Sequence, residues 1–424
     1  MKRALVIGQG GREHALVRAL ALSPSIEAVI AVPGSSGISA ESEKVRSIAT
    51  DWRDFESLHR LILLEKIDFV VVGPEVPLVD GLSDRLRERG VSVFGPSREG
   101  ARLEGSKVYS KEFIISAGVP TARSIVVRTV DETLRASSNF SPPYVLKADG
   151  LAAGKGVFIC KTLKELEDAA QSLFVSRSLG DAGSSALLEE FSPGYEISYL
   201  VLTNGVNFEP LVLAQDHKRL RTGDEGPNTG GMGVVAPVEI DPDLRVRINS
   251  EIVEPTLREM QKRSMLYRGV LYIGLMITPR GPSVIEYNAR FGDPETQVIL
   301  PLLDGDWGDV FSDVAEGRLP HLKWKRGSAA CVVLAAEGYP DSPVKGTAIV
   351  GLDRARAETG RYFLHAGTRR REDGQWITDG GRVLNSIGLG RDLREALELA
   401  YKQVQEVEWK GMQFRTDIGH GQKT

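Results

Sequence analysis

The first 103 residues repeat one pattern, in which a short apolar run is followed by a glycine turn and then by a helical stretch. Apolar runs of four or five residues bounded by turn residues are typical of buried parallel strands. Alternation of such strands with helices is typical of a doubly wound parallel sheet. The pattern therefore predicts an α/β N-terminal domain over residues 1–103, with strands at 4–7, 28–32, 69–72 and 91–94 and helices at 13–22 and 78–89.

Ligands of doubly wound sheets bind outside the carboxyl ends of the strands. Three of the predicted strand ends carry turn or charged residues, namely Gly8–Arg12, Pro33-Gly34 and Gly73-Pro74-Glu75. We therefore expect these segments to meet at one edge of the sheet.

The rest of the chain divides into two further units. Residues 104–327 mix helices and strands, and about 125–192 form a strand-rich subdomain with one helix expected at 163–174. Strands at 144–148 and 157–160, joined by a glycine loop, predict a hairpin flap. Residues 328–424 predict a small mixed α+β C-terminal domain. The other expected elements are strands at 196–202, 209–214, 270–277, 283–287, 329–335 and 362–365, a hairpin through 371–381, and helices at 243–263 and 393–407.

The composition excludes several classes of protein. The formal net charge of −4 gives no electrostatic basis for binding nucleic acid or an anionic membrane. The two cysteines, Cys160 and Cys331, fit a reducing compartment without a disulfide framework. No apolar run approaches the length of a membrane span. We therefore expect a cytoplasmic protein without nucleic-acid or membrane partners, and a monomer is the favoured state.

The turn after the first strand, Gly8–Glu13, departs from a dinucleotide-binding fingerprint. Glu13 stands where the third glycine belongs, and Pro33-Gly34 stands where an acidic residue would hold a ribose. A dehydrogenase is therefore disfavoured. Backbone N–H groups at a helix N-terminus, with Arg12 beside them, suit an anion such as a phosphate. The alternative is a tight turn that needs glycine for its geometry alone.

A second glycine loop places Lys147 and Lys155 around Gly150, Gly154 and Gly156, between two strands. Backbone N–H groups and ammonium groups arranged in this way can surround phosphates. The loop is not a Walker A motif, because no Ser or Thr follows the second lysine and a strand comes next instead of a helix. The alternative is a flexible hairpin tip with solvated lysines, which explains the two lysines less well.

Two segments carry weaker patterns. The strand at 187–191 ends in two acids and can present backbone groups to an adenine edge and a carboxylate to a ribose, although a plain strand end explains it equally well. The segment 215–233 contains Asp216 and His217, and its last eleven residues include five glycines. Mobile segments of this kind serve as active-site lids, while the alternative is an ordinary surface loop. A lone histidine is more often structural than catalytic.

The run 284–297 begins as an alternating strand, and side chains two apart on a strand share a face. Glu286, Asn288 and Arg290 are therefore expected on one side, with Ile285 and Tyr287 on the other. A carboxylate beside an amide oxygen suits Mg²⁺ held between protein and phosphates, and Mn²⁺ has the same preference. Such a polar row is costly to bury unless something binds it. The alternative is a solvated strand face.

Taken together, these segments resemble the ATP-grasp ligases. The likeness is carried by 147–157, 216–219, 226–233 and 285–297. Three motifs narrow it to the phosphoribosylamine–glycine ligase family, namely Gly8–Leu16, Gly73–Leu78 and Arg290–Gln297. The likeness covers nearly the whole chain, including 365–368 and 380–384. Gln9 departs from the asparagine usual in the family, which puts its contacts to the sugar phosphate in question.

The resemblance implies an ATP-grasp central domain and ligation of glycine to 5-phosphoribosylamine. ATP becomes ADP and phosphate, glycyl phosphate is the intermediate, and the product is glycinamide ribonucleotide of purine biosynthesis. A carboxylate is a poor acyl donor at neutral pH, so ATP must activate it. The main tasks of the protein are then positioning and charge neutralisation.

The resemblance also assigns roles to individual residues. Glu286 and Asn288 would hold the metal. The nucleotide would contact Lys107, Lys147, Gly150, Gly154, Lys155, Gly156, Glu189, Glu190, Phe191, Glu196 and Asn228. Phosphoribosylamine would contact Gly10, Gly11, Arg12, Glu13, Pro33, Gly34, Glu75, Arg290, Asp293, Pro294 and Glu295. The catalytic residues would be Arg290, Lys155 and Asp216.

Two alternatives stay open. Another ATP-grasp ligase or a carboxylase would share most of these motifs. A non-catalytic nucleotide-binding module would bind ATP without turnover, and it would be expected to have lost metal or lysine positions. Glu286, Asn288, Lys147 and Lys155 are all present, which weighs against that module.

Overall fold

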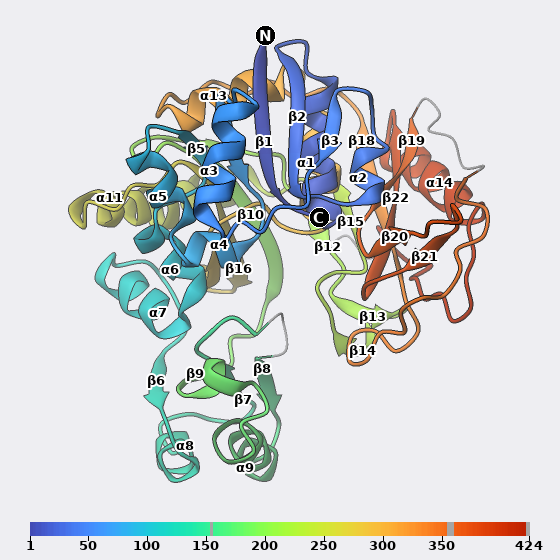
Figure 1. Ribbon diagram of the computed structural model, residues 1–424. Helices are drawn as coiled ribbons and strands as arrows, with labels where there is room; N and C mark the ends of the chain where they lie inside the picture. Colours follow the sequence, from blue (N-terminus) through green and yellow to red (C-terminus); the bar gives the residue numbers. More distant parts are fainter. Residues whose placement is uncertain (153–155, 354–359, 421–424) are drawn as a thin grey trace.

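The computed structural model describes residues 1–152, 156–353 and 360–420 of the 424-residue chain. The fold is mixed α/β. Three sheets surround a common centre, and a smaller sheet with two helices projects from them (Figure 1). In the described ranges, no helix combines the length and the apolar character needed to cross a membrane.

The N-terminal sheet has five parallel strands in the order β3-β2-β1-β4-β5, so the chain winds outward in both directions from β1. The predicted doubly wound sheet is thereby confirmed. The sequence analysis missed β3, because this strand has only three residues, of which one is buried. The strands are β1 (Lys2–Gly8), β2 (Ile26–Pro33), β3 (Val45–Ser47), β4 (Phe69–Val72) and β5 (Ser92–Phe94).

The prediction of a single helix at 78–89 is wrong. Two helices, α4 (Glu75–Val79) and α5 (Leu82–Glu88), are separated at Gly81, whose φ of +84° lies in the left-handed region. Helix α4 starts directly after β4, which places Glu75 at the strand end. The other helices around this sheet are α1 (Gly11–Leu22), α2 (Ser36–Ser39), α3 (Phe55–Leu64) and α6 (Arg98–Gly105).

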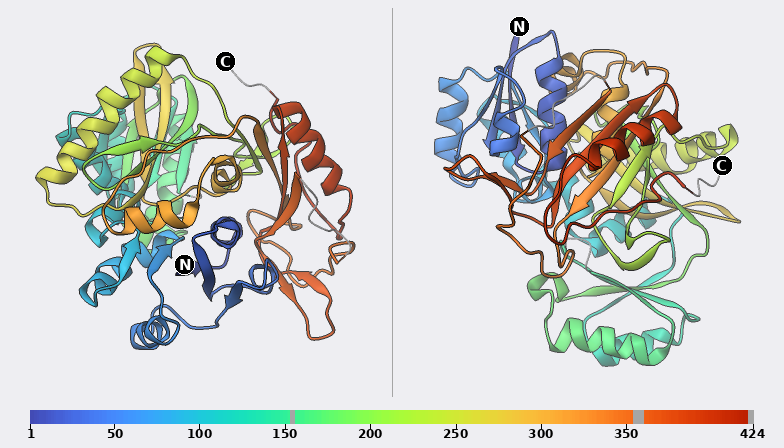
Figure 2. Two further views of the ribbon diagram at one scale, coloured as in Figure 1. Left: turned by 90° about the horizontal axis from the view of Figure 1, so that it is seen from above. Right: turned by 90° about the vertical axis from the view of Figure 1, so that its right-hand side faces the viewer.

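The projecting subdomain contains an antiparallel sheet in the order β6-β9-β7-β8. The right-hand view of Figure 2 shows the subdomain projecting from the rest of the molecule. Two helices pack on it where only one was expected. The missed helix α8 is capped by Thr129, whose hydroxyl accepts a hydrogen bond from the Glu132 N–H, a Thr-x-x-Glu pattern visible in the sequence. The elements are β6 (Ser124–Val127), α8 (Val130–Ser137), β7 (Tyr144–Ala148), β8 (Val157–Cys160), α9 (Leu163–Ala170), a π-helical turn (Gln171–Val175), a 3₁₀ turn (Gly180–Gly183) and β9 (Ala186–Glu190).

The central sheet is antiparallel, in the order β11-β10-β16-β17. The strand expected at 209–214 is shorter, because regular pairing with β10 ends at Pro210 and only an isolated bridge between Ser198 and Ala214 follows. The helix expected at 243–263 is present as three consecutive segments. The elements are α7 (Lys107–Ser116), β10 (Tyr195–Thr203), β11 (Phe208–Pro210), α10 (Pro242–Ile248), a π-helical segment (Asn249–Val253), α11 (Glu254–Lys262), β16 (Gly269–Thr278) and β17 (Gly281–Asn288).

The third sheet joins the central and C-terminal parts, in the order β12-β15-β18-β22-β19, with α14 packed on β18 and β22. It continues across the predicted boundary at 327/328, and that domain division stays a prediction. The strands are β12 (Gln215–Asp216), β15 (Gly233–Ala236), β18 (Ser328–Ala335), β19 (Arg361–His365) and β22 (Arg382–Gly390). Two hairpins, β13 (Arg219–Arg221) with β14 (Glu225–Asn228) and β20 (Thr368–Arg370) with β21 (Trp376–Thr378), and helix α14 (Leu393–Val404) complete this part.

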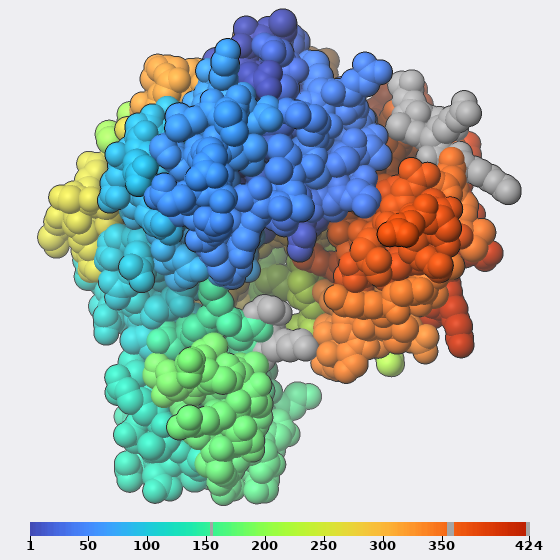
Figure 3. Space-filling model, viewed as in Figure 1, coloured from blue at the N-terminus to red at the C-terminus, as the bar shows by residue number. Residues whose placement is uncertain are grey.

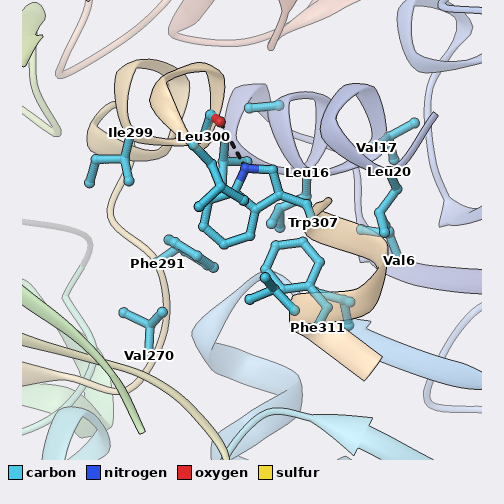
Figure 4. Packing of buried hydrophobic residues seen from close by; sticks show 14 of the residues in the cluster. Val6, Leu16, Val17, Leu20, Val270, Phe291, Ile299, Leu300, Trp307 and Phe311 are labelled. Atoms are coloured by element: carbon cyan, nitrogen blue, oxygen red, sulfur yellow. Dashed lines mark hydrogen bonds between the residues drawn. The ribbon is translucent and has the colours of Figure 1, made fainter. Parts of the chain in front are cut away.

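The main core lies where these parts meet, and Phe291 anchors the chain to it. Its ring packs at 6.3 Å from Trp307 and 6.0 Å from Phe311, measured between ring centroids (Figure 4). The Trp307 indole N–H donates to the Leu300 carbonyl oxygen at 2.7 Å. The backbone after β17 is therefore held by buried aromatic packing. The helices here are α12 (Glu295–Ile299), a 3₁₀ turn (Leu300–Leu302) and α13 (Trp307–Ala315).

Candidate functional site

The face between the subdomain and the C-terminal part is hollowed in Figure 3. Strand β17 and the turn after it contribute polar side chains to both ends of this region. At one end lies a lysine cluster, which we define as Lys107, Lys111, Lys147 and Lys218. At the other end lies an arginine cluster, defined as Arg12, Arg290 and Arg382.

Strand β17 contains a β-bulge that the sequence analysis did not anticipate. Val284 pairs with Leu275 and Glu286 with Gly274, so Ile285 is an extra residue between them. Beyond the bulge, the Tyr287 hydroxyl meets Thr256 in the apolar core at 2.5 Å. On the other side, the Arg290 guanidinium donates to the Asn288 Oδ1 at 3.4 Å. The bulge therefore separates the alternating buried side chains before it from the row of polar side chains after it.

Glu286 is held as a carboxylate by the lysine cluster. Burial raises its pKa, but the positive charges of Lys107, Lys218 and Lys147 outweigh burial and lower it. An ionised carboxylate beside the Asn288 amide supplies two hard oxygen ligands. The described residues contain no group of three or more His, Cys, Asp or Glu side chains placed for a metal ion. Phosphate oxygens or water would therefore have to complete the coordination of a divalent cation here.

Lys147 is buried and bound to Glu189, whose other oxygen binds a second buried lysine, Lys111. The distances are 2.7 Å for Lys147 Nζ to Oε2 and 2.9 Å for Lys111 Nζ to Oε1. Lys147 also reaches the Ile285 carbonyl oxygen at 3.4 Å. The three charges sum to one positive charge behind Glu286. Lys111 was not among the predicted site residues, although its place on the same face of α7 as buried Ile114 marks it as a buried lysine.

The start of the glycine loop, at Asp149, packs against the N-terminus of α7. Asp149 accepts hydrogen bonds from the Ser106 hydroxyl at 2.7 Å and the Val108 N–H at 2.9 Å, and its carbonyl accepts from the Lys107 N–H at 2.9 Å. The Gly150 N–H donates to Ala182 in the subdomain, and the Gly156 carbonyl accepts from Ala148. Gly154 and Lys155 lie outside the described residues.

The side chains at the end of β9 and directly after it face different surroundings. The Glu189 carboxylate faces inward to the lysines, whereas Glu190 pairs with Arg123 at 2.9 Å, and the Phe191 ring is 40% exposed. Glu196 on β10 binds Lys218 at 2.7 Å. Asn228 pairs with Arg219 in the β13–β14 hairpin. The segment expected to form a glycine-rich loop is thus largely a hairpin.

Asp216 on β12 lies beside the turn after β17. Burial and the neighbouring Glu295 raise its pKa well above the ordinary value. Its Oδ1 atom is buried and accepts no hydrogen bond within the described part of the chain. Glu295 itself accepts from the Tyr272 hydroxyl at 2.8 Å and the Ser198 hydroxyl at 3.3 Å. Glu295 and Pro294 therefore lie beneath the site, at the start of α12.

Arg290 is the centre of the arginine cluster. Its Nη2 binds Glu104 at 2.6 Å and its Nε approaches Glu75 at 3.5 Å. Arg12 lies 3.9 Å from the same Glu75 carboxylate and donates to the Phe291 carbonyl oxygen at 3.2 Å. The sequence analysis missed Glu104, since nothing in α6 indicates that its carboxylate reaches Arg290. Arg12 and Arg290 thus share the Glu75 carboxylate and retain further N–H donors for an anion.

Glu13 fills the turn where an anion was expected. Its carboxylate accepts from the Gly10 N–H at 2.7 Å and from Arg12 Nε at 2.6 Å. A side chain at Gly8 or Gly73 would lie within 2.4 Å of Glu13 atoms, so both glycines are needed for this approach. Glu13 is therefore a structural anion at the start of α1. This arrangement explains why the dinucleotide fingerprint fails at this position.

A cavity of about 300 Å³ opens between this turn and the C-terminal part. Pro33 ends β2, and Gly34 follows it directly before Ser35, which lines the cavity. Asp293 binds Arg382 at 3.2 Å and accepts from the Gln297 amide at 2.7 Å. Thr368, Asp379 and Arg382 were missed as site residues, although they lie in or next to the two C-terminal motifs of the resemblance. The lining residues are Gln9, Gly10, Gly11, Ser35, Asp293, Ala366, Gly367, Thr368, Asp379 and Arg382.

Comparison with known proteins gives matches along the whole chain. Family models of phosphoribosylglycinamide synthetase match in order, with the N domain at residues 2–104, the ATP-grasp (A) domain at 105–296 and the C domain at 329–421. A phosphoribosylamine–glycine ligase from a Nostoc species is 44% identical over 423 residues, 99% of each chain. A relative of the same name from Vibrio parahaemolyticus is 41% identical over 422 residues, covering 99% of this chain and 98% of the relative.

Solved structures agree with these matches. The phosphoribosylamine–glycine ligase of Thermotoga maritima superposes with a TM-score of 0.86 at 36% identity, covering 98% of this chain and 100% of that one. The biotin carboxylase domain of a Hydrogenobacter thermophilus 2-oxoglutarate carboxylase has a TM-score of 0.75 at 19% identity, covering 97% and 91%, which shows a shared fold alone. With matches of this extent and identity over its full length, the chain belongs to the phosphoribosylamine–glycine ligase family and has the ATP-grasp fold.

Proposed function

We propose that the protein ligates glycine to 5-phosphoribosylamine at the expense of ATP, giving glycinamide ribonucleotide, ADP and phosphate in purine biosynthesis. The observation that carries this proposal is that one segment serves both clusters. Glu286 faces the lysine cluster, and Arg290 and Asp293 belong to the arginine end of the site. A single strand and turn, anchored by Phe291, would then fix the distance between nucleotide and sugar phosphate.

The lysine cluster would bind the nucleotide. Lys107 and Lys147 would contact phosphates beneath the flap at 150–156, which includes Gly154 and Lys155. Because the Glu189 side chain is engaged by two lysines, backbone groups of 189–191 would hold the adenine edge. Glu196 would hold the ribose, with Lys218 fixing its carboxylate and Asn228 on the facing hairpin.

Glu286 and Asn288 would hold a divalent cation, Mg²⁺ or Mn²⁺, which supplies charge neutralisation to the triphosphate when bound. Glu286 fits this role because its neighbours keep it ionised. Asn288 fits because its amide oxygen is fixed by Arg290 rather than buried in the core.

The arginine cluster and the 300 Å³ cavity would bind phosphoribosylamine. Arg12 and Arg290 would attract its phosphate, with Glu75 between them near the sugar or its amine. Gly10, Gly11, Pro33, Gly34 and Asp293 would line the sugar pocket. Glu13, Pro294 and Glu295 would position these groups from behind. Gln9 lines the cavity and would reach the ligand with a side chain one methylene longer than asparagine.

The chemistry requires positioning more than covalent help from the protein. The glycine carboxylate attacks the γ-phosphorus of ATP, ADP leaves, and glycyl phosphate forms. The phosphoribosylamine nitrogen then attacks the carbonyl carbon, phosphate leaves, and the nitrogen loses a proton. We propose catalytic roles for Arg290, Lys155 and Asp216 at the reacting carboxylate, where the two cations would balance its charge and Asp216 would help to orient the substrate. Closure of the subdomain over the site would keep water from glycyl phosphate.

We further propose the organisation expected from the sequence. The chain would form domains at 1–103, 104–327 and 328–424, with residues about 125–192 hinged as a lid. The protein would act as a monomer in the cytoplasm, with ATP, glycine and phosphoribosylamine as its only partners.

The test is a coupled assay of ADP release. We expect ADP only when glycine and phosphoribosylamine are both present, in equal amount with glycinamide ribonucleotide. ADP release with another acid or amine, and none with this pair, would identify a different ATP-grasp ligase. Tight ATP binding without release under any combination would identify a nucleotide-binding module.

A further inference from the structure

The end of the described chain is bound to the hairpin beside Asp216. Arg415, whose side chain is only 1% exposed, forms a two-pronged contact with Asp417, with Nε to Oδ1 and Nη2 to Oδ2 both at 2.7 Å. Its remaining nitrogen, Nη1, donates to Asp224 at 2.7 Å and to the Arg219 carbonyl oxygen at 3.2 Å. One buried guanidinium therefore joins the C-terminal tail to strand β13 and to the turn of the β13–β14 hairpin.

Backbone contacts extend this connection. The Thr416 N–H donates to the Thr222 hydroxyl at 3.1 Å, and the Gly223 N–H donates to Asp417 Oδ2 at 2.9 Å. These contacts occur at the far turn of the hairpin. The turn therefore rests on the tail, although glycines at 223 and 226 adopt left-handed conformations there.

The tail also contacts both ends of the segment that contains the hairpin, at His217 and Gly233. The Gly419 N–H donates to His217 Nε2 at 3.3 Å. The buried side chain of Ile418 packs where a Cβ at Gly233 would lie, 2.4 Å from its Cδ1. His217 separates Asp216 from Lys218, so its attachment fixes the strand from the side opposite to them. The contacts to residues 415–419 thus run from His217 to Gly233.

We propose that the C-terminal tail, Arg415–Gly419, is a positioning element that holds Lys218 against Glu196 in the nucleotide half of the site and holds Asp216 beside the turn after β17. Lys218 binds Glu196 at 2.7 Å. Release of the tail would free a glycine-rich hairpin, and the side chains of Asp216 and Lys218 would lose their fixed position. Arg415 acts through the hairpin and touches no substrate.

This inference rests on the proposed roles of Asp216 and Glu196. It adds a positioning element, the C-terminal tail, that lies far from both residues in the sequence. Because phosphoribosylamine would be held by elements other than this hairpin, the tail should affect the two substrates unequally. Loss of the tail should raise the KM for ATP and lower kcat, while the KM for phosphoribosylamine stays within about twofold. A displacement of about 1 Å is enough for a loss of roughly 100-fold in rate.

The experiment compares three single variants of the full chain. Arg415→Ala removes every contact of the guanidinium and leaves the other contacts of the tail in place. Asp224→Asn removes only the charge of Asp224, on a side chain that is 73% exposed, and asparagine tolerates the φ of 56° at this position. Glu225→Gln is the matched control, because it removes the adjacent exposed carboxylate of the same hairpin. Steady-state kinetics with each substrate varied are measured together with hydrogen exchange of residues 217–228.

We expect Arg415→Ala to lower kcat/KM for ATP about tenfold or more and to accelerate exchange in the hairpin, with Asp224→Asn changing both in the same direction by less and Glu225→Gln changing neither. Unchanged ATP kinetics in folded Arg415→Ala, or an equal rise of all three KM values with unchanged hairpin exchange, would overturn the proposal. If Arg415→Ala does not fold, Asp224→Asn decides in the same way. Wild-type protein is assayed first, and absence of glycine-dependent ADP release there would refute the proposed function instead.

Discussion

Neutralising Glu189 should destabilise the protein strongly, because this carboxylate separates two buried ammonium groups. Lys111 comes from α7 in the central part, while Lys147 and Glu189 come from β7 and β9 of the subdomain. The exposed fractions of the three side chains are 5%, 8% and 4%. Glu189→Gln keeps the shape of the side chain but leaves two cations facing each other out of water. The substitution therefore tests the effect of one charge, at the junction between the central part and the subdomain.

The magnitude follows from the distances of 2.9 and 2.7 Å. At an effective dielectric constant of about 20, each attraction amounts to roughly 6 kcal/mol. The variant also avoids the cost of desolvating a carboxylate, several kcal/mol, so only part of the loss remains. Breaking a buried ion pair at one partner typically costs about 3–5 kcal/mol. At roughly 2–4 °C per kcal/mol for a domain of this size, Tm should fall by about 10 °C.

The assay is thermal unfolding at neutral pH, with Glu190→Gln as the matched control. Glu190 is the next residue of the same strand, but its partner Arg123 is 71% exposed, so its pair contributes about 0–1 kcal/mol. Burial raises the pKa of Glu189, but Lys147 and Lys111 outweigh it and lower that pKa. The stabilisation is therefore complete above the unfolded pKa of about 4.5 and is lost as pH falls below it. Equal Tm values for the two variants, within about 1 °C, would refute the reasoning.

Three further predictions concern the site itself. Glu286→Gln should raise the Mg²⁺ concentration needed for half-maximal turnover and lower kcat by roughly 100-fold, and near-normal turnover at low Mg²⁺ would contradict the metal assignment. Arg290→Met should raise the KM for phosphoribosylamine and lower kcat by about 10²–10³-fold, whereas unchanged values of both would remove Arg290 from the sugar site. Burial and Glu295 raise the pKa of Asp216, so the folded wild type loses stability as pH rises from the unfolded pKa toward the folded one. The Tm of Asp216→Asn should therefore exceed that of wild type by a margin that grows with pH, and a margin independent of pH would argue against a buried, strained carboxylate.

The parts of the fold that local rules govern were predictable. The apolar runs at Ala4–Ile7 and Phe69–Val72, each followed by a turn, gave the parallel sheet because a buried strand and its turn are written in adjacent residues. The failures also have local causes. Gly81 breaks one helix into two, and β3 is too short to show a pattern. The capping pattern at Thr129 was present in the sequence and was overlooked.

The site was predictable only in part, because its side chains meet across large separations in the sequence. The alternation of β17 indicated that Glu286 and Asn288 share a face, but not the bulge at Ile285. Lys111 and Glu104 went unrecognised, since each binds a residue far along the chain. The roles proposed for the site residues stay predictions until variants are measured.

The sequence by itself determined the family and the kinds of chemical group available, because motifs and residue types are properties of short segments. Only the tertiary structure decided which charges meet. Glu13 fills the turn that the sequence offered to an anion, since Gly8 and Gly73 leave room for its side chain. Arg415 reaches the hairpin beside Asp216 from the C-terminal tail. Such contacts depend on the distance between folded segments, and no local pattern encodes that distance.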